Sequence, residues 1–100
     1  MIIYNVTVKI DLDVHDEWLY WMKNVHIPEV MLTGKFAENR MMRVMEDDSS
    51  EGITYAIQYS CETMADYLEY QEKFAPDLQK EHTERYKDKY VAFRTLLKEV

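Results

Sequence analysis

Hydrophobic and polar residues alternate along several segments of the chain, as they do in β-strands that have one buried face. Residues 1–10 put an apolar side chain at every even position from Tyr4 to Ile10, with Asn5 and Thr7 on the opposite face. The run DDSSEG before Ile53 has turn chemistry at nearly every position and predicts a hairpin. Strands are predicted at residues 1–10, 35–46, 53–61 and 91–100.

Two other segments show the period of amphipathic helices. The first begins at Asp13, a residue type that caps helices, and its apolar stripe includes Trp18 and Trp21. Pro28 cannot continue a helix without the loss of a hydrogen bond. Residues 28–32 are therefore expected to form a separate short turn.

The second helical segment runs from Thr63 to Tyr90 and carries one apolar stripe along its length. Pro76 is expected to kink or restart this helix, because proline has no amide proton to donate. The stripe consists of Met64, Tyr67, Leu68, Gln71, Phe74, Ala75, Leu78, His82 and Tyr86. Gln71 and His82 are polar, and a polar group on a buried stripe needs a hydrogen-bond partner or a function.

The element order is strand, helix, strand, strand, helix, strand, within a single domain that spans residues 1–100. This order predicts an α+β, ferredoxin-like βαββαβ fold, a four-stranded antiparallel sheet with two helices on one face. The other face carries large apolar side chains, which monomers seldom leave exposed. We therefore expect a homodimer in which two sheets face each other.

Charge and composition exclude several classes of partner. The net charge of −7 is unfavourable for binding nucleic acid or anionic membrane surfaces. No run of residues is long and apolar enough for a membrane helix, and the N-terminus lacks the features of an export signal. Cys61 is the only cysteine, which is typical of a reducing compartment, so we expect a cytoplasmic protein.

The start MIIYNVTV and the run APDLQKEHTERY resemble those of a family of short bacterial proteins of unknown function. This resemblance extends over essentially the whole chain. More broadly, the chain is similar to the antibiotic-biosynthesis monooxygenase-like group, which has this element order. The resemblance implies a dimeric α+β barrel and brings no established activity with it.

Some monooxygenase-like relatives degrade haem and use an Asn on the first strand with a Trp and a His on the second long helix. By this resemblance, Asn5 and His82 occupy comparable places. The tryptophan has no counterpart, because Trp18 and Trp21 both lie on the first predicted helix. The chain thus departs from the pattern of the haem-degrading relatives.

The predicted ligand pocket lies under the long helix, near Asn5, Gln71 and His82. His82 is the candidate for catalysis, as an axial ligand or an acid/base group, because histidine titrates near neutral pH. The alternative is a buried histidine bonded to a strand carbonyl or a tyrosine hydroxyl. Gln71 has the same two interpretations, as a ligand contact or as the partner of a backbone group.

Other polar residues fit no catalytic pattern. If their sheet face lines the barrel, Asn5, Thr7, Gln58 and Ser60 are candidates to bind a small polar molecule, and if that face is solvated they are ordinary outward strand residues. His15 and His26 are too far apart along one helix to share a metal ion. No metal and no cofactor is expected.

Two classes of function remain. The first is a homodimeric small-molecule binding or interaction module. The alternative is a monooxygenase-like enzyme that acts on haem or an aromatic substrate, with His82 as ligand or base.

Overall fold

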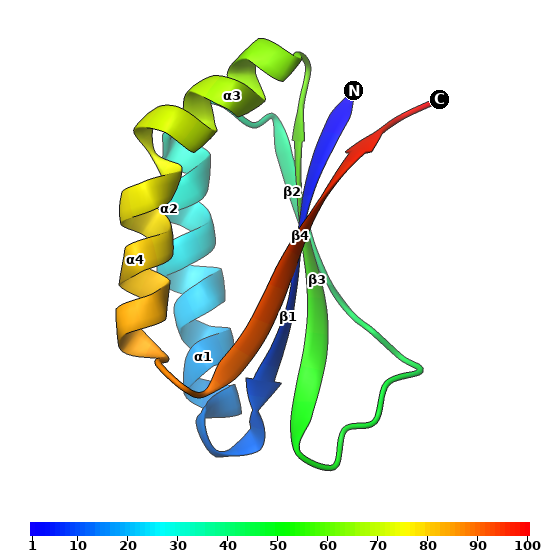
Figure 1. Cartoon of the computed structure of the whole chain (residues 1–100), viewed down its shortest axis with the longest axis vertical. Coiled ribbons are helices and arrows are strands. Elements are labelled where there is room, and N and C mark those ends of the chain that lie inside the picture. The colour runs from blue at the N-terminus through cyan, green and yellow to red at the C-terminus, as the bar shows by residue number, and fades with distance from the viewer.

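The computed structural model describes residues 1–100 as one sheet with helices on one side, in the predicted α+β, ferredoxin-like arrangement. In Figure 1, α1, α2 and α4 run along the same side of the sheet, while α3 lies across one end of it. The strands are β1 (Ile2–Asp11), β2 (Glu38–Arg43), β3 (Gly52–Cys61) and β4 (Tyr90–Lys98). The helices are α1 (His15–Trp21), α2 (Ile27–Leu32), α3 (Met64–Lys73) and α4 (Ala75–Arg85), with short turns η1 (Leu12–Val14) and η2 (Met22–His26).

The sheet has the strand order β2-β3-β1-β4, and every neighbouring pair is antiparallel. β1 is a central strand, and its Val6 lies opposite Ile57 of β3 on one side and Arg94 of β4 on the other. Side chains that are paired in this way point to the same face of a sheet. The register therefore places Arg94 on the same face as the apolar residues of β1.

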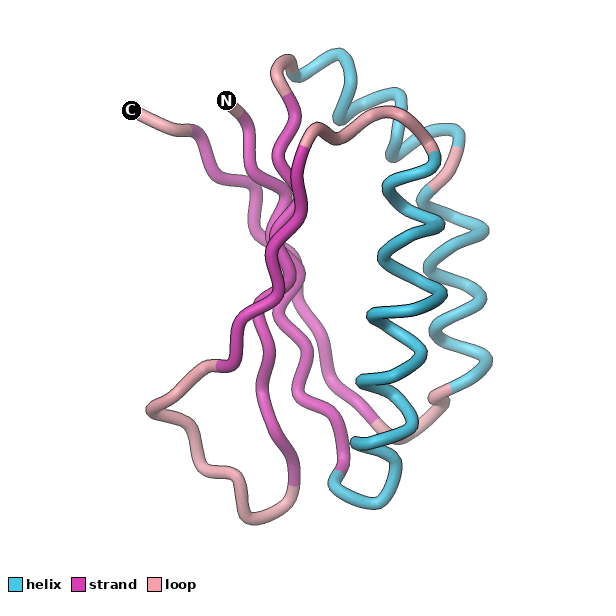
Figure 2. The backbone as a smooth tube through the Cα atoms, turned by 180° about the vertical axis from the view of Figure 1, so that it is seen from behind, coloured by secondary structure: helices cyan, strands magenta, loops and turns pink.

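The alternation predicted for β1 and β3 is confirmed. Tyr4, Val8 and Ile10 of β1 are buried, as are Ile57 and Tyr59 of β3, and all five lie on the face that the helices cover. The helices and the sheet form two layers, seen from the other side in Figure 2. The core between these layers contains the cavity described below.

The first helical segment differs from the prediction at Pro28, because the residues from Pro28 onward are not separated by a break from the helix before them. The chain stays helical from α1 to α2 through η2, a π-helical turn of residues 22–26. A π turn widens the helix and so accommodates a proline that cannot donate to the preceding turn. Pro28 sits in the first turn of α2, where its missing amide proton costs little.

The second helical segment is divided near Pro76, as predicted. Thr63 caps α3 by accepting a hydrogen bond from the amide of Asp66, and α4 restarts with Pro76 in its first turn. The predicted stripe is wrong at three positions of α3. Tyr70 is buried although it lies off that stripe, whereas Met64 and Leu68 lie on the stripe and are 41% and 57% exposed. The reason is that α3 crosses the end of the sheet and turns a different side toward the core.

The sheet face without helices, which we call the open face, combines apolar and polar side chains. Its apolar members include Met42 of β2 and Val91, Phe93 and Leu97 of β4, all of them exposed. The residues between β2 and β3 form a hairpin loop that extends away from the helices (Figure 1). No helix is long and apolar enough to cross a membrane.

Candidate functional site

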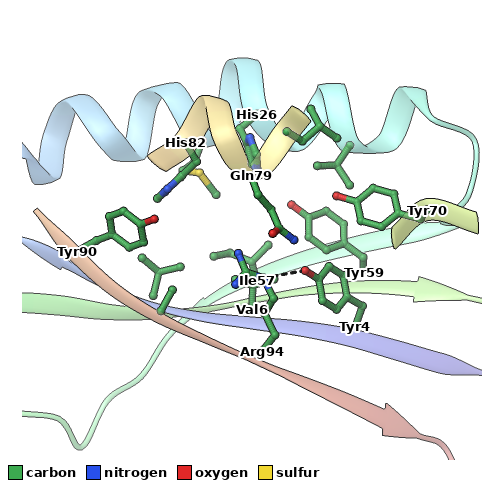
Figure 3. Close-up of a pocket in the computed structure, with 15 residues that line it drawn as sticks. Tyr4, Val6, His26, Ile57, Tyr59, Tyr70, Gln79, His82, Tyr90 and Arg94 are labelled. Carbon is green, nitrogen blue, oxygen red and sulfur yellow. Dashed lines mark hydrogen bonds between the residues drawn. The ribbon is translucent and has the colours of Figure 1, made fainter. Parts of the chain in front are cut away.

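A cavity lies between the helices and the covered face of the sheet (Figure 3). The cavity has a volume of about 40 Å³, which is room for roughly three water molecules. Most of the lining is apolar or aromatic. The polar groups come from Tyr4, His26, Tyr59, Tyr70, Gln79, His82, Tyr90 and Arg94.

His82 of α4 is held from the first helix. The indole nitrogen of Trp18 donates a hydrogen bond to Nε2 of His82 across 2.9 Å, and both side chains are buried. Because Nε2 accepts this bond, the proton of the neutral ring lies on Nδ1. His82 therefore offers a donor, and not a base, at its second nitrogen.

His26 lies next to His82, with 5.9 Å between the ring centroids. It is the last residue of the π-helical turn, a feature often found at functional sites. Its Nδ1 atom is buried without a hydrogen-bond partner. The sequence pattern missed His26 as a pocket residue, because only the π turn brings it to the side of the helix that faces the cavity.

Both histidines are neutral at pH 7. Burial lowers the pKa of His26 to about 4. Burial is also the main reason why the pKa of His82 is lowered to about 4, with smaller contributions from His26 and Arg94. Two buried cations so close together would lack any counter-charge, because the cavity lining contains no carboxylate.

Arg94 reaches the cavity from the edge strand β4. Its Nε donates to the hydroxyl oxygen of Tyr4 across 3.0 Å, drawn as a dashed line in Figure 3. The ring of Tyr4 is itself fixed by tilted contacts with Tyr67 and Tyr70, at centroid distances of 5.4 and 6.0 Å. The guanidinium group is therefore held through Nε, and its two terminal nitrogens make no hydrogen bond within the chain.

Tyr59 and Tyr70 are each 3% exposed, and Figure 3 shows their hydroxyls directed toward the middle of the cavity near Gln79. The tyrosine hydroxyls that make hydrogen bonds within the chain belong to Tyr4, Tyr55, Tyr86 and Tyr90. Tyr59 and Tyr70 are not among them. Burial raises the pKa of both well above the usual value, so both hydroxyls stay protonated and can donate.

The structure does not bring together the three residues predicted to share a pocket. His82 lines the cavity, whereas Asn5 lies on the open face, on the far side of the sheet. There its amide donates to Thr7 and accepts from Gln58, at 3.0 and 3.2 Å. This arrangement follows from the strand period, since Asn5 is one residue from the inward-facing Tyr4.

Gln71 is also separate from the cavity lining. Its Nε2 atom is buried and has no hydrogen-bond partner. Gln79, two helical turns later, is the glutamine that enters the cavity (Figure 3). No three histidine, cysteine, aspartate or glutamate side chains are grouped so that they could hold a metal ion.

Comparison with protein families identifies the chain over its whole length. The family described as a domain of unknown function, DUF4286, matches residues 1–100. The chain belongs to the DUF4286 family. No curated protein matches this DUF4286 chain in sequence.

Solved structures share the fold of this DUF4286 protein at low sequence identity. HapK from Hahella chejuensis has a TM-score of 0.72 and 10% identity, over 100% of this chain and 93% of that one. SnoaB from Streptomyces nogalater, described as a cofactor-independent oxygenase, has a TM-score of 0.64 and 8% identity over 98% and 92% of the two chains. A dimeric ferredoxin-like protein from an uncultured marine organism has a TM-score of 0.54 and 18% identity over 99% and 97%. These similarities confirm the α+β, ferredoxin-like fold.

Proposed function

We propose that this DUF4286 protein is a homodimeric module that binds a small organic molecule in the cavity between its helices and sheet. One observation supports this most strongly. The buried Nδ1 atom of His26 has no hydrogen-bond partner, and the hydroxyls of Tyr59 and Tyr70, which make no hydrogen bond within the chain, face the same mostly apolar cavity. Buried polar groups are normally satisfied within the protein, so such a convergence is typical of a binding site.

The cavity must widen when the ligand enters, because a ring-sized molecule needs more room than roughly three waters occupy. The side chains able to move are those that are only partly buried. Leu78 and Gln79 on α4 and Tyr90 on β4 are of this kind, and Arg94 is exposed. Entry is therefore proposed between α4 and β4.

The proposed dimer joins the open faces of two sheets. Phe93 is 62% exposed and Val91 is 68% exposed on this face, and a second copy would cover both. The polar row formed by Asn5, Thr7 and Gln58 would then lie inside the interface, already hydrogen-bonded within each chain. The related ferredoxin-like protein from a marine organism is described as dimeric, which also favours this assembly.

A second candidate is an oxygenase-type enzyme that acts on an aromatic substrate in the same cavity. The fold shared with SnoaB, a cofactor-independent oxygenase by its description, favours this candidate. Haem is less favoured as a substrate, because Nε2 of His82 already accepts from Trp18 and the cavity is small. Oxygen consumption with an aromatic substrate, lost in a folded His82→Ala variant, would support this activity.

Native mass spectrometry of the freshly purified protein tests the binding module directly. The expected spectrum is that of a dimer, and excess mass that disappears on denaturation identifies a retained ligand. The ligand should be absent from a Tyr59→Phe, Tyr70→Phe double variant that remains dimeric. A monomer would contradict the proposed assembly, and excess mass retained unchanged by the double variant would place the ligand outside this cavity.

The cytoplasm is the proposed location. Cys61 is buried, and its thiol donates to the carbonyl oxygen of Thr63 across 3.4 Å. Burial raises the pKa of this thiol, which keeps it protonated. A single unreactive thiol is typical of proteins in a reducing compartment.

A further inference from the structure

Arg94 carries the only permanent charge in the cavity lining. The lining contains no aspartate or glutamate, and both of its histidines are neutral. None of the ion pairs in the protein involves Arg94. The cavity is therefore locally positive within a chain whose net charge is −7.

The neutral polar groups around Arg94 are mostly donors. The hydroxyls of Tyr59 and Tyr70 stay protonated, and Nδ1 of His82 carries the ring proton. Beside them, the guanidinium group has two nitrogens free after Nε donates to Tyr4. A site with several donors and one cation matches a ligand with negatively charged oxygen atoms.

Tyr4 makes this arrangement more selective than a mobile surface arginine would be. Its hydroxyl accepts from Nε and so limits rotation of the guanidinium plane. Its ring belongs to an aromatic cluster with Phe36 and Tyr59, each at a centroid distance of 6.2 Å. A pre-oriented guanidinium group binds a carboxylate through two parallel hydrogen bonds with a smaller loss of freedom.

We propose that the ligand is an organic anion, with a carboxylate or similar acidic group on Arg94 and an apolar body between the aromatic side chains of the sheet and α4. This inference rests on the proposed function, because it names the class of molecule that the same cavity would bind. It also excludes amines, since a cationic group would meet Arg94 without any carboxylate to balance it.

Three carboxylic acids, each paired with its own amide, test the effect of the ligand's charge separately from the effect of its shape. Benzoate, phenylacetate and hexanoate are titrated against benzamide, phenylacetamide and hexanamide, and the backbone amide signals of the ¹⁵N-labelled protein are followed by NMR. At least one acid should shift the amide signals of His82 and Tyr59 and bind at least about tenfold more tightly than its amide. Benzylamine should not bind.

Arg94→Met should reduce the affinity for that acid to the level of its amide, and Arg94→Lys should recover only part of it. Arg43→Met is the matched control, because Arg43 is an exposed arginine on β2, at the opposite edge of the sheet. It should leave the affinity unchanged. The dispersion of the amide spectrum shows whether each variant is folded.

Two results would overturn the inference in distinguishable ways. If acids and amides bind equally well at His82 and Tyr59, or if benzylamine binds best there, the pocket stands and the anionic ligand class is wrong. If none of the seven compounds shifts these signals in the wild-type protein, the proposed binding function fails together with the ligand class. The titrations of the wild-type protein with the acids, the amides and benzylamine need no variant. An unfolded Arg94→Met protein therefore does not prevent the test.

Discussion

The indole N–H of Trp18 and the Nε2 atom of His82, two residues 64 positions apart in the chain, form a buried hydrogen bond of 2.9 Å between α1 and α4. This bond explains why His82 interrupts an apolar stripe without leaving its Nε2 atom unpaired. It also assigns the ring proton to Nδ1, on the other side of the ring from Trp18. The histidine is thus both a structural contact between α1 and α4 and a donor at the cavity.

Replacing Trp18 with phenylalanine should destabilise the protein and free His82. We expect the free energy of unfolding to fall by about 2–4 kcal/mol, because the variant loses buried volume and leaves Nε2 without its donor. Urea denaturation measures the loss. Long-range ¹H–¹⁵N spectra of the wild type should show Nδ1 protonated, and a proton on Nε2 instead would contradict the assignment.

The buried histidines should make stability depend on pH. An unfolded histidine titrates near its ordinary pKa of 6.5, whereas folded His26 and His82 titrate at about 4. Above pH 6.5 neither state binds a proton at these sites. As the pH falls from 6.5 to about 4, the unfolded state takes up protons that the folded state does not, so the free energy of unfolding decreases, by up to roughly 3 kcal/mol for each histidine.

A comparison of wild type with His26→Gln isolates this effect, since both proteins have the same carboxylates. The variant should lose less stability over the same pH range, because only His82 still contributes. Urea denaturation at several pH values gives the two curves. Parallel curves between pH 6.5 and 4 would mean that His26 does not titrate differently in the folded and unfolded states.

Phe93→Lys should weaken the proposed dimer. The substitution puts two charges, one from each subunit, into the apolar part of the interface, where their desolvation is unfavourable. Sedimentation velocity should show more monomer than for the wild type at the same concentration. Leu68→Lys is the control, since Leu68 is 57% exposed and Phe93 is 62% exposed, but Leu68 lies on α3. Equal effects of the two variants would argue against an interface on the open face.

Thr63→Ala should lower the free energy of unfolding by about 1 kcal/mol, the typical effect of losing a helix cap. The hydroxyl of Thr63 accepts from the amide of Asp66 across 3.2 Å, and alanine cannot replace that acceptor. Thr63→Ser keeps the hydroxyl and should keep most of the stability. A loss of the same size in both variants would show that the methyl group, and not the cap, is responsible.

The strand period was sufficient to predict the sheet and its two faces. Alternation in β1 separates Asn5 from Tyr4, and the structure confirms that separation. The resemblance to haem-degrading proteins grouped Asn5 with His82, and this grouping conflicts with the strand period. In β4 the same alternation places Arg94 with Ala92, but the sequence does not say which of the two sheet faces the helices cover.

Other parts of the site depend on contacts that no local pattern encodes. The bond between Trp18 and His82 joins two helices through their packing on the sheet. Tyr70 enters the core because α3 crosses the end of the sheet, and a helical projection contains no information about that crossing. His26 faces the cavity because of a π turn, which the presence of Pro28 alone does not predict.

The π turn at Met22–His26 also controls the rotation between the two halves of the first helix. Each residue of an ordinary α-helix advances the side-chain direction by about 100°. On that count, Ile27 would point about 180° away from Trp18, yet both are buried against the same layer. The turn acts as one extra residue that resets the angular phase. A relative that lacked one residue here could form a regular α-helix and still bury the residues equivalent to Ile27 and Val30, and an alignment of the two sequences should place its gap within this turn.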